Sequence, residues 1–130
     1  MCDLGNTTTR FKNIHLSGGV IKSGGTSSQF LRADGTVDRI IRGDISSAGA
    51  IQQGSGFSMG TITTGRYPIN FTPAFSSVPT VVVSINATEG DYGFIGTASL
   101  TASGFIVMTR YSSSILSNTT PFNFIVIGPN

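Results

Sequence analysis

Alternation of apolar and polar residues in the second half of the chain is the feature that most restricts its fold. The alternation is clearest over residues 67–71 and 122–127. A period of two places successive side chains on opposite faces of a β-strand, whereas a helical face repeats every 3.6 residues. Serine and threonine supply many water-facing positions, since the chain has 33 of them against 14 charged residues. The pattern therefore predicts an all-β fold.

Six alternating or β-branched runs follow one another after residue 55, separated by Gly, Pro, Asn or Ser. They cover residues 56–64, 67–71, 79–85, 92–101, 105–109 and 122–127. Short strands at this spacing are typical of a small sandwich or barrel. We expect five phenylalanines to form most of its core: Phe71, Phe75, Phe105, Phe122 and Phe124. The sequence thus predicts an antiparallel β-sandwich of about six strands over residues 55–130.

Residues 1–54 differ, because they are punctuated by glycine and poor in apolar side chains. Residues 33–36, Ala-Asp-Gly-Thr, predict a hairpin or tight turn. Alternating pieces such as residues 11–16 and 29–31 are too short to close a core alone, whereas identical copies could share one. We therefore expect residues 1–54 to be a trimeric shaft and anchoring segment, and the protein to be a homotrimer. For residues 39–53 we expect an irregular linker with at most one helical turn.

Charge and cysteine content exclude several classes of protein. The net charge is +2 with no basic run, so no nucleic-acid partner is expected. No apolar stretch approaches the roughly 20 residues of a membrane span, so no membrane insertion is expected. Cys2 is the single cysteine and cannot build a disulfide framework or a zinc knuckle by itself.

Catalysis is also not expected. The single histidine, His15, lies in the predicted shaft. Three copies around a trimer axis would bring their imidazoles together and could hold an anion or a metal, but a solvated or stacked strand residue is the simpler interpretation. The sequence contains no supported Ser-His-Asp arrangement and no phosphate loop. We therefore expect a protein that is not an enzyme and has no cofactor.

The candidate binding residues lie in polar segments between the predicted strands of the sandwich. They are Glu89, Asp91, Tyr92, Arg110 and Tyr111. Tyrosine stacks on sugar rings, while arginine and carboxylates bond to sugar hydroxyls. Glu89 and Asp91 could share a cation, although a solvated turn is the simpler interpretation, and the two tyrosines fit subunit contacts of a trimer equally well. The polar loop over residues 112–120 is a second candidate.

Residues 42–44 spell Arg-Gly-Asp, the tripeptide that integrins bind. In an exposed linker it would be accessible to a receptor. Such a short motif arises readily by chance, and we interpret it as a coincidence.

Several stretches resemble fibre proteins of viruses and phages. In the first half they are residues 4–20, with the core RFKNIHLSGGV, and residues 25–37, GTSSQFLRADGTV. The second half is similar to the C-terminal β-sandwich modules of phage tail fibres, which are likened to H-type lectins. The matching elements include TGRYPINF at 64–71, VPTVVV at 78–83 and FNFIVIG at 122–128. These are framework residues in that family, so the resemblance implies a six-stranded sandwich, a trimer and an attachment role, and supplies no sugar site.

The expected function follows from this resemblance. The chain would be a fibre protein on the virion surface, acting as a homotrimeric, distal host-attachment module that contacts a host surface glycan or protein. A capsid or tail adaptor protein would hold its N-terminal segment. The alternative is structural: a head fibre or capsid decoration whose sandwich serves trimerisation and stability.

Overall fold

The computed structural model describes residues 8, 16–18, 23–86, 93–111, 116 and 120–130. Within these residues the chain contains no helix, which confirms the predicted all-β class. The strands are β1 (Gln29–Leu31), β2 (Val37–Ile45), β3 (Ile51–Gly54), β4 (Phe57–Met59), β5 (Arg66–Phe71), β6 (Thr80–Ile85), β7 (Phe94–Thr101), β8 (Gly104–Arg110) and β9 (Phe122–Pro129). All their pairings are antiparallel.

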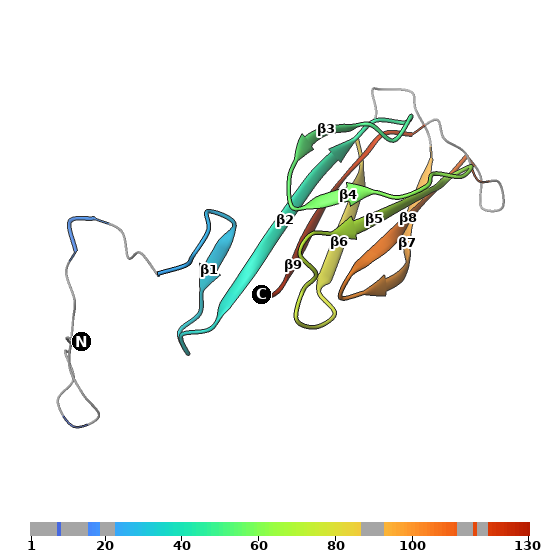
Figure 1. The fold of residues 1–130 in the computed structure, drawn as a ribbon. Helices are drawn as coiled ribbons and strands as arrows, with labels where there is room; N and C mark the ends of the chain where they lie inside the picture. The colour runs from blue at the N-terminus through green and yellow to red at the C-terminus, as the bar shows by residue number, and fades with distance from the viewer. Residues whose placement is uncertain (1–7, 9–15, 19–22, 87–92, 112–115, 117–119) are drawn as a thin grey trace.

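The strands form two sheets, which Figure 1 shows as two layers. Sheet A has the order β1-β2-β9-β6, with β3 also paired to β2. Sheet B has the order β4-β5-β8-β7. The last strand, β9, lies between β2 and β6, so sheet A is completed only when the C-terminal strand pairs with two strands from earlier in the chain.

The hydrophobic core lies between the two sheets, and aromatic rings make many of its contacts. Its buried members are Ile41, Ile45, Phe57, Tyr67, Ile69, Phe71, Phe75, Phe105, Val107, Phe122, Phe124 and Val126. Phe124 of sheet A meets Phe57 and Phe105 of sheet B edge-on, with ring centroids 4.9 Å and 5.5 Å apart. Such ring pairs contribute about 0.5–1.5 kcal/mol each beyond the burial of their area. The five phenylalanines expected in the core are all buried, as predicted.

The hairpin signal at Asp34-Gly35 is confirmed, because β1 and β2 pair around residues 32–36. Gly35 has a φ of +84°, a left-handed conformation that glycine adopts without steric cost. The Asp34 carboxylate accepts hydrogen bonds from the Thr36 hydroxyl and backbone N–H, at 2.7 and 2.9 Å. These bonds favour the charged form and lower the pKa of Asp34.

The expectation of an irregular linker over residues 39–53 is wrong, because β2 and β3 occupy most of it. Within β2 the residues at 39, 41, 43 and 45 are buried, so the strand alternates like those of the second half. Its first inward residue is Arg39, which a hydropathy pattern does not assign to a core. The guanidinium donates to the Pro73 carbonyl at 2.7 Å and lies 4.2 Å from the centre of the Phe75 ring. These two contacts offset part of the cost of burying the charge, since Nε of Arg39 is buried without a hydrogen-bond partner, and burial lowers the pKa of Arg39.

Strand β2 joins residues on both sides of the boundary expected at residue 55. It pairs with β9 from Asp38 opposite Pro129 to Ile45 opposite Phe122. Ile41 and Ile45 belong to the same core as the residues of the second half. Strands lie in each of the six runs expected after residue 55, and β1 to β3 add to sheet A. Residues 1–7, 9–15 and 19–22 of the predicted shaft, His15 among them, lie outside the described residues.

Candidate functional site

The structure describes two of the five residues expected to bind a ligand, and it places them at one end of sheet B. Arg110 is the last residue of β8, and Tyr111 follows it directly. The other three, Glu89, Asp91 and Tyr92, lie outside the described residues.

Arg110 is paired across the sheet with Phe94, the first residue of β7. Paired residues of neighbouring strands project from the same face, and both belong to the face that points away from the core. Phe94 is 59% exposed and Tyr111 is 69% exposed, which is unusual for large aromatic side chains in a small domain. The end of sheet B therefore carries two exposed aromatic rings. Phe94 lies opposite Arg110, and Tyr111 follows Arg110 in the chain.

The backbone beneath this end is closely packed. Arg110 forms an isolated antiparallel bridge with Leu116. A Cβ added at Gly93 would lie 2.9 Å from the Thr120 hydroxyl and 3.2 Å from the Arg110 carbonyl, and Thr120 is buried. The backbone around Gly93, Arg110 and Thr120 is thus close together here, and this packing fixes the positions of Phe94 and Arg110.

A second arginine extends the basic character of the same face. Arg66 of β5 is paired with Met108, which precedes Arg110 by two residues on β8. Gly96, on the other side of Met108, leaves open space above the sheet. The acidic residues that the structure describes, Asp34 and two on β2, are all in the β1–β2 region, so the described part of this face carries positive charge alone. We refer to the surface formed by Arg66, Phe94, Gly96, Met108 and Arg110 as the basic outer face.

Sequence reasoning did not select Phe94 or Arg66. Phe94 stands in a strand-like run and was expected simply to be a strand residue. The signal that could have found it is the hairpin turn at residues 102–103, since Thr101 opposes Gly104. Counting outward from that turn brings Phe94 opposite or next to Arg110, although the bulge between Ala98 and Thr101 shifts the count.

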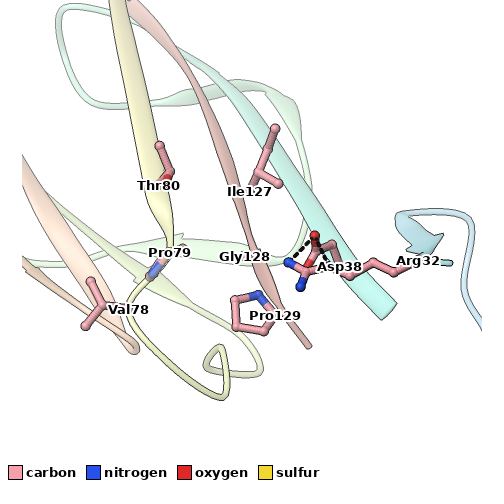
Figure 2. Close-up of a pocket in the computed structure, with 8 residues that line it drawn as sticks. All are labelled: Arg32, Asp38, Val78, Pro79, Thr80, Ile127, Gly128 and Pro129. Atoms are coloured by element: carbon pink, nitrogen blue, oxygen red, sulfur yellow. Dashed lines mark hydrogen bonds and ion pairs between the residues drawn. The ribbon is translucent and has the colours of Figure 1, made fainter. Parts of the chain in front are cut away.

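A cleft of about 390 Å³ lies at the end of sheet A where β2 and β6 begin and β9 ends. Figure 2 shows the residues around it. Arg32 and Asp38 form its polar wall, with Arg32 Nε donating to Asp38 Oδ2 at 2.7 Å. Val78, Pro79 and Pro129 form an apolar wall. Because Arg32 and Asp38 neutralise each other, the cleft offers less charge to a ligand than the basic outer face does.

The Arg-Gly-Asp tripeptide lies in the middle of sheet A and not in an exposed linker. Residues 42–44 are extended within β2, and Gly43 and Asp44 pair with both β9 and β3. Gly43 packs beneath the rings of Phe57 and Phe124. A tripeptide fixed in a paired strand cannot adopt the shape of a projecting receptor loop, so the structure favours coincidence.

Other kinds of site find little support in the described part of the chain. No group of three His, Cys, Asp or Glu side chains that could hold a metal ion is found among the described residues. The part of the chain that the structure describes also contains no helix long and apolar enough to cross a membrane.

The chain matches no family model, no curated protein and no solved structure. The geometry of the two sheets is therefore the basis for inferring what the chain does.

Proposed function

We propose that the chain is a fibre protein of a virion surface, acting as a homotrimer whose basic outer face attaches to a host surface glycan. In this proposal β4 to β9 correspond to the H-type-lectin-like sandwich, and β1 to β3 of the first half complete its sheet A. The residues before β1 would contain the shaft and the end that a capsid or tail protein anchors. The protein binds and does not catalyse a reaction.

The observation that carries the proposal is the pairing of the exposed Phe94 with Arg110 at one end of sheet B, with the exposed Tyr111 next in the chain. Exposed aromatic rings beside arginine are enriched at binding surfaces, because they contribute apolar area with few rotatable bonds. Each of the two rings has more than half of its surface open to solvent. Tyr111 also keeps a hydroxyl for a hydrogen bond at the rim of a ligand.

The chemistry of this surface suits a sugar, and an acidic sugar in particular. The apolar face of a pyranose ring can stack on Phe94 or Tyr111. The Arg110 guanidinium presents several N–H donors, which can bind a carboxylate or two neighbouring hydroxyls. Arg66 adds a second positive charge on the same face and would speed the encounter with an anionic cell surface.

The test is binding of the full-length chain to a glycan panel and to intact host cells, with Phe94→Ala, Arg110→Ala and Tyr111→Ala measured beside the wild type. Loss of one anchoring residue of this kind costs about 1–3 kcal/mol, so affinity should fall roughly 5- to 140-fold. Arg32→Ala is the matched arginine control, since Arg32 lies beside β1 on sheet A, and its binding should equal that of the wild type.

A structural role is the competing proposal, and the same experiment separates the two. If the wild-type chain binds neither glycans nor cells, while particles still incorporate it, the attachment function is ruled out. The protein would then be a head fibre or capsid decoration whose sandwich holds three chains together.

A further inference from the structure

The outer face of sheet A is unusually apolar for a surface open to water. Strands β2, β9 and β6 bury alternate residues in the core, and their remaining residues point outward. Val82 is 64% exposed on this face, Ile125 is 49% exposed and Ile127 is 45% exposed. In an antiparallel sheet that covers a core on one side, the other side is ordinarily polar.

The strand register makes these side chains one continuous patch. Val82 lies directly opposite Ile125, and Ile40 lies directly opposite Ile127. Phe30 of β1 is 57% exposed and is paired with Asp38 of β2, so both project from the same face. Asp38 precedes Ile40 by two residues, so Ile40 also projects from this face. We refer to Phe30, Ile40, Val82, Ile125 and Ile127 as the apolar outer face.

This patch continues into a groove of about 1270 Å³ that runs along β2 between β1 and the β3–β4 turn. Phe30, Ile40 and Ile125 contribute to the groove, as do Arg42 and Asp44. The face is therefore both apolar and hollowed, which are the properties of a surface that another protein covers.

The charges around the two outer faces indicate which of them can meet a copy of itself. On the sheet A side Arg32 and Asp38 are paired with each other, and Arg42 and Asp44 add one charge of each sign at outward positions of β2, so copies can be placed with opposite charges in register. The described part of the sheet B face carries arginines alone, so two copies would bring like charges together. Complementary charge favours association and like charge opposes it.

We infer that the apolar outer face of sheet A is the surface through which copies of this chain pack together. The inference rests on the homotrimer of the proposed function and names the surface that forms it. Three copies then turn their sheets A toward one another and keep their basic outer faces of sheet B on the outside, accessible to a ligand.

The test measures the mass of the full-length protein by light scattering and native mass spectrometry. The wild type should have the mass of three 13.5 kDa chains. Ile125→Asp should shift the population to single chains at micromolar concentration, because three carboxylates would be buried at the interface. Phe94→Asp is the matched control: it places the same charge on an equally exposed apolar residue of sheet B, and its mass should stay that of three chains.

A labelling experiment covers the case in which Ile125→Asp fails to fold. In a Cys2→Ser background, Val82→Cys should react with a thiol reagent at least tenfold more slowly than Ser58→Cys, which is exposed on β4 of sheet B. Circular dichroism checks that each variant keeps its strands.

The outcomes distinguish the inference from the proposed function. A wild-type mass of one chain overturns the homotrimer and the inference together. A wild-type mass of three chains, with Val82→Cys labelled as fast as Ser58→Cys or with folded Ile125→Asp still trimeric, overturns the inference alone and places the interface elsewhere.

Discussion

The two sheets share one core but differ in how they are assembled and in what they show to solvent. Sheet B draws on residues 57–71 and 94–110, and its central strands β5 and β8 pair across the stretch of chain that contains β6. Sheet A draws on residues 29–54, 80–85 and 122–129, so it needs contacts between residues far apart in the chain. Charges of both signs lie around the exposed Val82, Ile125 and Ile127 on its outer face, whereas the described charges on the outer face of sheet B are arginines.

This difference fits the two roles that we propose for the sandwich. A surface that ligands reach must stay exposed, and charge keeps it soluble. A surface that another chain covers can be apolar, because water does not contact it in the assembly. Sheet A is thus the sheet that we propose to be covered, and sheet B is the one that we propose to face the ligand.

The largest effect is expected from removing the first 54 residues, because this deletes strands of sheet A and none of sheet B. A chain of residues 55–130 loses β2, which pairs with β9 over its whole length, and loses Ile41 and Ile45 from the core. For so small a domain these losses exceed the usual margin of stability. We expect no cooperative unfolding transition in urea for residues 55–130.

A chain of residues 23–130 is the control, since it keeps all nine described strands and should unfold cooperatively. If residues 55–130 instead fold with the same stability as residues 23–130, then the second half is an independent domain, and β2 is an accessory to it.

How much of this arrangement the sequence could predict depends on the pattern of each strand. The core phenylalanines, the strands after residue 55 and the Asp34-Gly35 turn follow from period-two alternation and turn chemistry. Strand β2 was missed because its inward positions include Arg39 and Gly43, which a hydropathy pattern does not count as core. Their burial depends on the Pro73 carbonyl, the Phe75 ring and the rings above Gly43, and these come from distant parts of the chain.

The candidate site was predicted only in part, for a related reason. Arg110 and Tyr111 were chosen for their residue types in a segment between strands. Phe94 and Arg66 join them through the pairing of β7, β8 and β5, and pairing partners are set by tertiary structure. The apolar outer face is likewise a product of register, because Val82 and Ile125 are 43 positions apart in the sequence and directly opposite in the sheet.

Substitutions at two glycines can compare how tightly the buried side of sheet A and the open side of sheet B are packed. A Cβ at Gly43 would come within 2.6 Å of the Cζ atoms of Phe57 and Phe124, whereas a Cβ at Gly96 meets nothing within 4 Å. Gly43→Ala forces the rings apart and should lower the free energy of unfolding by about 1–3 kcal/mol. Gly96→Ala should leave it unchanged or raise it by up to about 1 kcal/mol, since glycine is the poorer strand residue.

Urea denaturation of both variants measures this difference. Equal stability of the two variants would mean that the space between the sheets is loose at Gly43, contrary to the close ring packing described for the core.

The smallest effect concerns a single hydrogen bond that ties the two sheets together. Tyr67 of sheet B donates its hydroxyl to the carbonyl of Ser47, in the turn between β2 and β3, at 2.7 Å. Tyr67→Phe leaves that carbonyl without this donor and should cost about 1 kcal/mol of stability at pH 7. Tyr111→Phe, at an exposed position, should cost nothing measurable.

The same bond predicts a response to alkaline pH. Burial raises the pKa of Tyr67 above its ordinary value, so the folded state holds the proton more tightly than the unfolded state. The stabilisation is therefore complete below about pH 10 and is lost as the pH rises through the pKa of the folded state. As the pH rises above about 10, the urea midpoint of the wild type should fall by more than that of Tyr67→Phe. An equal fall in both would show that ionisation of other groups, and not this link between the sheets, limits stability at high pH.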